Sequence, residues 1–243
     1  MSWDKITEQQ NSASANIDEN STLEILSIIN NEDAGVALAI QKKLTEIEAF
    51  IDALIPKIRR GGRLFYVGSG TSGRLGVLDA AECPPTFSTD PEMVQGIIAG
   101  GYDALVKSIE GAEDNPADGS KAIVDYGINS EDTVLGITAS SSTPFVLGAL
   151  EKAKEIGAMT GLLLSNNPPK LEYVDYIISI IVGPEVITGS TRMKAGTATK
   201  LVLNMITTTL MIKLNKTYGN LMVDLKASNE KLWDRGTRII QHL

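Results

Sequence analysis

Two residue types that carry much of enzyme chemistry are almost absent from this chain. Its 243 residues include one histidine, His242, and one cysteine, Cys83. A single histidine beside the C-terminus leaves no material for a Ser-His-Asp triad or a histidine-based metal site. One cysteine excludes an intramolecular disulfide and favours a reducing compartment. Without a histidine partner, Cys83 is expected to be a packed thiol, so acid–base chemistry has to come from carboxylates.

The chain also lacks a positive charge balance and a long apolar run. The formal net charge is −8 at pH 7, which argues against broad electrostatic binding to nucleic acid or to an anionic membrane. No apolar stretch reaches membrane-spanning length, and the start does not resemble a signal peptide. We therefore expect a cytoplasmic protein. No set of carboxylates is spaced for a metal site, so no bound metal is expected.

Aromatic residues are scarce, at 5%, whereas 43% of the chain is hydrophobic and 22 residues are glycine. This composition suits an α/β fold with a parallel sheet packed by aliphatic helices. Apolar strands are predicted at 64–67, 94–99, 133–138, 159–164 and 176–182. Helices are predicted at 22–29 (capped by Ser21), 36–58, 74–81, 104–109, 144–156 and 193–213. Three parts are expected: an N-terminal arm with helices (1–60, of which 1–20 is extended), the α/β domain (61–215) and a helical C-terminal segment (216–243).

The most informative motif follows the first predicted strand, at 68–74. Gly68, Gly70 and Gly73 have the G-x-G-x-x-G spacing. No lysine is present for a Walker loop, and no acidic residue ends a second strand to bind a ribose, as a dinucleotide site requires. A strand that turns through glycines onto a helix N-terminus binds anions, and hydroxyls at Ser69, Thr71 and Ser72 add donors. A small phosphate ester is the predicted ligand, with a tight structural turn as the alternative.

A second hydroxyl-rich loop occupies a corresponding place. Ser140, Ser141, Ser142 and Thr143 separate a predicted strand from a helix that starts at Pro144. A third loop, 183–194, precedes the long apolar helix and ends in Lys194, which is either a cation for the phosphate or a helix-surface lysine. Because ligands bind at the carboxyl ends of parallel strands, these loops are predicted to share a phosphate site.

Two carboxylate positions are candidates for acid–base chemistry. Glu82 lies among small and apolar residues near Pro84, where burial would let it hold a proton near neutral pH. Glu110 and Glu113 flank Gly111 after the second strand. From spacing alone, a solvated surface is the competing interpretation for these two.

The motifs together resemble the sugar isomerase (SIS) superfamily, and closely the N-acetylmuramic acid 6-phosphate etherase family. The resemblance covers nearly the whole chain, and it is carried by Gly68–Arg74, Leu78–Thr86, Ile98–Gly101, Glu110–Asp114, Val182–Thr199 and Gly219–Asp224. It implies a three-layer SIS-type fold with an N-terminal helical extension. It also implies a cytoplasmic homodimer that needs no metal or cofactor. Relatives tend to continue past the position of residue 243 with another helical segment, so this chain is expected to be either truncated or a short natural form.

The family's reaction is cleavage of the D-lactyl ether of N-acetylmuramic acid 6-phosphate, in recycling of cell-wall sugars. By this resemblance Glu113 is the base that removes the C2 proton, and Glu82 protonates the leaving oxygen and then activates water. The phosphate-binding hydroxyls fall on the two hydroxyl-rich loops. Relatives often carry an arginine in the second loop, whereas this chain has serines. An aldose–ketose isomerase and a non-catalytic sugar-phosphate-sensing regulator remain the alternatives.

Overall fold

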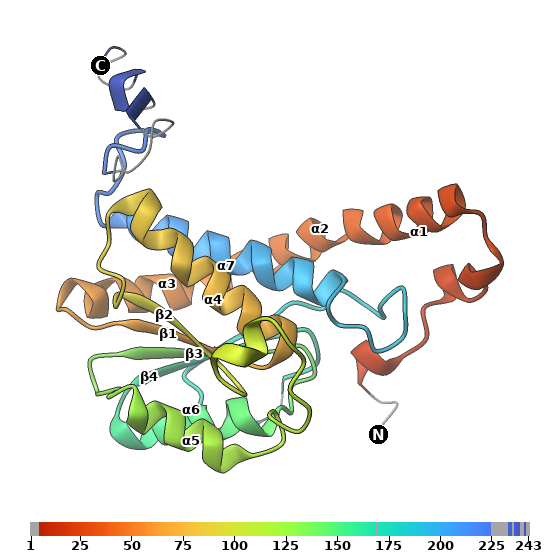
Figure 1. The fold of residues 1–243 in the computed structure, drawn as a ribbon, viewed down its shortest axis with the longest axis horizontal. Coiled ribbons are helices and arrows are strands. Elements are labelled where there is room, and N and C mark those ends of the chain that lie inside the picture. Colours follow the sequence, from red (N-terminus) through yellow and green to blue (C-terminus); the bar gives the residue numbers. More distant parts are fainter. Residues whose placement is uncertain (1–4, 169, 225–232, 235, 239–240, 242–243) are drawn as a thin grey trace.

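In the computed structural model, the described residues (5–168, 170–224, 233–234, 236–238 and 241) form a three-layer α/β fold (Figure 1). Its central sheet has five parallel strands in the order β2-β1-β3-β4-β5. The strands are β1 (Leu64–Gly68), β2 (Val94–Ile98), β3 (Thr133–Thr138), β4 (Met159–Leu164) and β5 (Tyr176–Ser179). Each lies where the apolar pattern predicts a strand, so the predicted fold class is confirmed.

Helices cover both faces of the sheet. One face is packed by α2 (Val36–Gln41), α3 (Leu44–Arg59), α4 (Gly70–Phe87) and α7 (Lys194–Lys213), and the other by α5 (Pro116–Asp125) and α6 (Pro144–Ile156) (Figure 1). Along β1, Leu64 and Tyr66 enter the first core, whereas Phe65 and Val67 enter the second. Both sides of each central strand are therefore buried, which explains the continuous apolar runs in the sequence.

Three predicted helices are corrected. The helix predicted at 36–58 is broken into α2 and α3 around Lys43. The one predicted at 104–109 is only a 3₁₀ turn, η4 (Tyr102–Leu105), followed by a loop, because Val106 and Ile109 are exposed and have no core to pack against. The helix that crosses to β3 is instead α5. Finally, α4 is longer than the predicted 74–81, since it begins at Gly70 and continues through Pro84 and Pro85 to Phe87.

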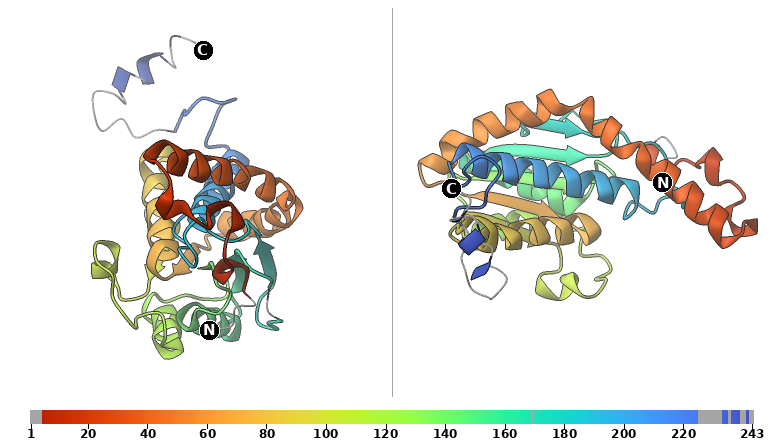
Figure 2. Two further views of the ribbon diagram at one scale, coloured as in Figure 1. Left: turned by 90° about the vertical axis from the view of Figure 1, so that its right-hand side faces the viewer. Right: turned by 90° about the horizontal axis from the view of Figure 1, so that it is seen from above.

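The N-terminal arm is also more ordered than the extended chain predicted for it. Its described part forms three 3₁₀ turns, η1 (Ile6–Glu8), η2 (Ser12–Ser14) and η3 (Ile17–Glu19). Helix α1 (Thr22–Ala34) follows, with the predicted Ser21 cap completed by Glu24 as a capping box. No residue of α1 is buried, and the helix projects beyond the sheet (Figure 2). Residues 5–20 then fold back toward the loops at one edge of the sheet (Figure 1).

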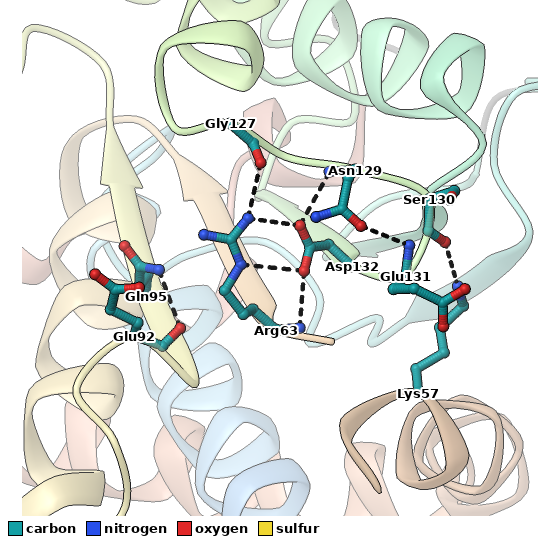
Figure 3. A network of polar contacts seen from close by, with 9 residues as sticks. All are labelled: Lys57, Arg63, Glu92, Gln95, Gly127, Asn129, Ser130, Glu131 and Asp132. Atoms are coloured by element: carbon teal, nitrogen blue, oxygen red, sulfur yellow. Dashed lines mark hydrogen bonds and ion pairs between the residues drawn. The ribbon is translucent and has the colours of Figure 1, made fainter. Parts of the chain in front are cut away.

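A polar network fastens the opposite, amino-terminal edge of the sheet (Figure 3). The Asp132 carboxylate, which precedes β3, accepts hydrogen bonds from the Arg63 backbone N–H at 2.9 Å and from the Arg63 guanidinium at 2.7 Å. The same guanidinium donates to the carbonyl of Gly127 at 2.9 Å. Because Asp132 is almost fully buried, this bidentate pair holds the starts of β1 and β3 together. These polar groups satisfy one another's hydrogen-bonding capacity. The network at the amino-terminal edge therefore has a structural role.

The strand order determines where a ligand can enter. From β1 the chain moves to β2 on one side, and it then crosses to β3 on the other side. Helices α4 and α6, which follow β1 and β3, consequently lie on opposite faces. The loops that precede these helices diverge at the carboxyl edge and leave a crevice there.

Close glycine packing joins β1 to α4 at this crevice. A Cβ at Gly73 would lie 2.6 Å from the Ile98 side chain and 2.7 Å from the Gly68 carbonyl oxygen. Gly70 has a φ of 52°, in the left-handed region that favours glycine. The three glycines of the motif therefore let the helix begin directly against the strand end.

We expect Gly73→Ala to lower the free energy of unfolding by about 1–3 kcal/mol, because the added methyl overpacks against backbone that cannot retreat. Chemical denaturation measures this change. The control is Gly35→Ala, where the nearest atom to the new Cβ is at 3.5 Å and the expected change is within about 0.5 kcal/mol. Equal stability of the two variants would contradict the packing argument.

Candidate functional site

A cavity of about 280 Å³ lies at the carboxyl edge, where the loops after β1 and β3 diverge. Both hydroxyl-rich loops line it, together with one residue of the N-terminal arm and two of the third loop. The lining is Glu8, Ser69, Gly70, Thr71, Ser72, Glu113, Ile137, Thr138, Ala139, Ser140, Thr143, Gly189 and Thr191. Segments from five distant parts of the chain, Glu113 being the fifth, thus meet at one cavity.

Two helix N-termini at this cavity have no side-chain cap among the described residues. Ser69 is the N-cap residue of α4 but makes no capping hydrogen bond. Thr143 is the N-cap residue of α6, and its hydroxyl is hydrogen-bonded to that of Thr138 at 2.7 Å. The start of α4 therefore presents first-turn amides without a capping side chain. In α6, Pro144 has no N–H and the Phe145 N–H donates to the Glu113 carbonyl at 3.0 Å, so this helix contributes mainly the positive end of its dipole. Both features favour binding of an anion.

The N-terminus of the third helix that begins at this edge, α7, is already capped by a side chain of the protein. The buried Glu185 carboxylate accepts hydrogen bonds from the backbone N–H groups of Lys194 and Ala195, each at 2.9 Å. Burial raises the pKa of Glu185, whereas these backbone amides and the positive charge of Lys194 oppose the rise. A carboxylate of the chain thus fills the position that an anion would take at α7, and α4 and α6 are left for a ligand.

The Ser69 hydroxyl is a second sign of a ligand. Its oxygen is buried and has no hydrogen-bond partner among the described residues. Ser69 lines the cavity and also a larger adjoining one of about 380 Å³. A buried hydroxyl without a partner is costly, and an oxygen of a bound ligand would satisfy it.

The predicted hydroxyls are not equivalent in the structure. Ser69, Thr71, Ser72, Ser140 and Thr143 line the cavity, whereas Ser141 and Ser142 are not part of its lining. The exposed Ser142 instead accepts a hydrogen bond from the ammonium of Lys5. The arm thereby brings a positive charge to the second loop.

Lys194 fits neither role that the sequence left open for it. Its side chain is only 4% exposed, and its ammonium forms an ion pair with Glu32 of α1. It is therefore not a surface lysine, and its charge is neutralised by a residue of this chain. This contact joins the projecting helix α1 to the start of α7.

Glu113 lies at the junction of the two cavities and lines both. Its backbone carbonyl accepts a hydrogen bond from the N–H of Phe145, in the first turn of α6, at 3.0 Å. In the segment that precedes Glu113, the carbonyls of Leu105 and Lys107 accept hydrogen bonds from the Arg74 guanidinium of α4, at 3.2 and 2.9 Å. The loop that carries Glu113 is thus held to both helices whose N-termini flank the smaller cavity.

Sequence comparison places these features in a family. The family model of the glucokinase regulatory protein N-terminal SIS domain matches residues 46–154. A protein named N-acetylmuramic acid 6-phosphate etherase from Clostridium acetobutylicum is 56% identical over 241 residues, which are 98% of this chain and 80% of that protein. One of the same name from Bacteroides thetaiotaomicron is 52% identical, over 99% of this chain and 87% of its own. The chain belongs to the N-acetylmuramic acid 6-phosphate etherase family.

Solved structures of distant proteins share the fold. A putative phosphosugar isomerase from Bacteroides fragilis has a TM-score of 0.60 at 16% identity, over 81% of this chain and 93% of its own. A phosphoheptose isomerase from Neisseria gonorrhoeae has a TM-score of 0.59 at 13% identity, over 78% of this chain and 98% of its own. At these identities the likeness extends to the SIS fold alone.

The second glutamate implied by the etherase resemblance lies elsewhere in this chain. Glu82 is exposed on α4, about 18 Å beyond Gly70 at 1.5 Å per helical residue. It lines neither the 280 Å³ nor the 380 Å³ cavity. The buried surroundings suggested by its neighbours in sequence are therefore absent within one chain, and one chain does not bring Glu82 and Glu113 together.

Three residues of the lining with polar side chains were not predicted as site residues: Glu8, Thr138 and Thr191. Thr191 belongs to the third loop, whose convergence on this edge was predicted because ligands bind at the carboxyl ends of parallel strands. Thr138 is the last residue of β3 and was treated as part of the strand. Glu8 has no local signal, because only the folding back of the arm brings it to the cavity.

The remaining candidates are settled by burial or lie outside the described residues. Cys83 is buried, and its thiol contacts the carbonyl of Asp79 at 3.4 Å, so the predicted packed thiol is confirmed. His242 lies outside the described residues. Among the helices that the structure describes, none is long and apolar enough to cross a membrane.

We expect the Cys83 thiol to resist alkylation by iodoacetamide in the native protein. Burial, with smaller contributions from Asp79 and Glu82, raises its pKa to about 12, so the reactive thiolate stays rare even near pH 9.5. Mass spectrometry of protein labelled between pH 7 and 9.5 checks this, with the urea-unfolded chain as the fully reactive control. Rapid native labelling that increases through pH 8.5, as for a free cysteine, would contradict it.

Proposed function

We propose that this chain cleaves the D-lactyl ether of N-acetylmuramic acid 6-phosphate, giving N-acetylglucosamine 6-phosphate and D-lactate. The name shared by relatives at 51–56% identity supports this reaction. One observation in the structure carries it: a carboxylate, Glu113, lines the same cavity as two helix N-termini without side-chain caps. Recycling of cell-wall sugars in the cytoplasm, without a cofactor, is the proposed setting.

The phosphoryl group is proposed to bind between the starts of α4 and α6. Backbone N–H groups in the first turn of α4 and the positive end of the α6 dipole favour an anion at this position, and the hydroxyls of Ser69, Thr71, Ser72 and Ser140 add donors. These donors replace the water that a phosphate dianion loses on binding. Holding the phosphoryl end in place leaves the sugar carbons free to reach Glu113.

The proposed chemistry is an elimination followed by addition of water. In the open-chain sugar, the C1 aldehyde acidifies the C2 proton, which passes to the Glu113 carboxylate. The resulting enolate forms a C2–C3 double bond and breaks the bond from C3 to the lactyl oxygen, which takes a proton from Glu82. Water then adds at C3 and returns a proton to Glu82, while C2 regains its proton from Glu113. Each positioned proton transfer contributes about 10²–10⁴-fold in rate.

We propose that Glu82 reaches this cavity from a second copy of the chain. In one chain the two glutamates are separated by most of the length of α4, so one substrate cannot contact both. Glu82 lies on an exposed helix face next to Leu78, an apolar residue that is 52% exposed. A symmetric dimer built on this face would place each Glu82 near the partner's cavity.

We expect the purified protein to release D-lactate from N-acetylmuramic acid 6-phosphate, and Glu113→Gln to lower kcat by at least about 10²-fold, because the base is lost. Coupled lactate detection measures this. The matched control is Glu110→Gln, since Glu110 lines only the larger cavity. Formation of a ketose without lactate would favour an isomerase and overturn the proposal.

Mixing two inactive variants tests the shared site. Dimers formed from Glu82→Gln and Glu113→Gln chains contain one cavity with both changes and one with neither. After subunit exchange at equal concentrations, we expect about a quarter of wild-type lactate release, whereas each variant alone stays inactive. A mixture as inactive as its components would show that no dimer shares the site in this way.

A further inference from the structure

The N-terminal arm forms one wall of the cavity, although it is more than a hundred residues from the second hydroxyl loop. A single side-chain amide, Asn166, joins the two. Its oxygen accepts from the Ile6 N–H at 2.7 Å, and its nitrogen donates to the Thr7 hydroxyl and to the Ala139 carbonyl, each at 2.9 Å. Asn166 and Thr7 are both buried, so the arm is a built part of the site.

The next residue of the arm, Glu8, reaches into the cavity. Its carboxylate lies against the third loop at Gly189, where an added Cβ would be 3.1 Å from Oε2 and φ is already 75°. Among the described residues, no donor and no cation contacts this carboxylate. Glu8 is thus a half-buried, acceptor-only group for which the described part of the chain provides no partner.

We propose that Glu8 is a substrate-contacting residue that accepts a hydrogen bond from a hydroxyl or amide N–H of the sugar. A carboxylate cannot bind a phosphoryl dianion and repels it, whereas it forms strong hydrogen bonds with neutral donors. The cavity therefore has an anion-binding side, at α4 and α6, and an acceptor side, at Glu8. This polarity suits a ligand with a phosphate at one end and hydroxyl or amide donors at the other. The choice of an amino-sugar phosphate as that ligand rests on the proposed function.

The same polarity predicts discrimination against inorganic phosphate. A small dianion gains the helix N-termini but no hydrogen bond from Glu8, and it experiences the negative charge. A sugar phosphate gains both contacts. Glu8 would then contribute to affinity for the sugar phosphate and subtract from affinity for phosphate alone.

Isothermal titration of wild type and Glu8→Gln with N-acetylglucosamine 6-phosphate and with inorganic phosphate tests this. We expect the variant to bind the sugar phosphate about tenfold or more weakly, as for loss of a hydrogen bond to a charged group. Its affinity for inorganic phosphate should be unchanged or higher. The control is Glu19→Gln, which removes an exposed carboxylate of the same arm outside the cavity and should change neither affinity.

A loosened arm would weaken both ligands alike, and this outcome would overturn the proposal. So would an unchanged or tighter affinity for the sugar phosphate, or a wild type that prefers inorganic phosphate. If Glu8→Gln does not fold, Glu8→Asp is titrated instead, since it keeps the charge on a shorter side chain. We expect it to lose less affinity for the sugar phosphate than Glu8→Gln would, with no loss of affinity for inorganic phosphate. Lactate release by wild type decides the proposed reaction separately, so either idea can fail without the other.

Discussion

The candidate site depends on two helices that begin without a side-chain cap. Most helix N-termini satisfy their first amides with a serine, threonine or acidic side chain, as α1 and α5 do here with Ser21 and Asn115. At the carboxyl edge of the sheet, α4 and α6 have no side-chain cap. The N-terminus of α7 is instead capped by the Glu185 carboxylate. The contrast among neighbouring helices locates the position where an outside anion would be held.

The two edges of the sheet divide structure from function. At the amino-terminal edge, Arg63 and Asp132 satisfy each other and fasten the starts of β1 and β3. At the carboxyl edge, the polar groups converge on a cavity, and two of them, the Ser69 hydroxyl and the Glu8 carboxylate, have no partner among the described residues. Satisfied polar groups stabilise a fold, whereas buried ones without a partner cost free energy. Of the three buried hydroxyls that have no partner among the described residues, those of Ser69, Thr89 and Thr133, only that of Ser69 lines the cavity.

The N-terminal arm contributes to the cavity, although its sequence predicts no ordered structure. It would be expected to remain extended, because it is polar and has no periodic apolar face. Long-range contacts order it instead: Asn166 binds residues of η1, and Ser14 donates to the carbonyl of Val186 at 2.7 Å. The arm brings Glu8 into the cavity and Lys5, of opposite charge, to Ser142 outside its lining.

Local pattern was sufficient for much of the fold. Buried strands are apolar runs bounded by turn residues, so all five were located, whereas their order in the sheet came from the structure. The errors occurred where tertiary contacts override local preference. Val106 and Ile109 are apolar at helical spacing but find no core, and α4 continues past its prolines because its inner face stays packed.

By itself, the sequence determined the fold class, the two hydroxyl-rich loops and their placement after strands, since these depend on residue types a few positions apart. Tertiary structure alone decided which groups share a cavity. It closed α7 with Glu185, neutralised Lys194 with Glu32, and placed Glu8 beside Glu113 and Glu82 away from both. Such relations depend on contacts between residues far apart in the chain, and no local spacing encodes them.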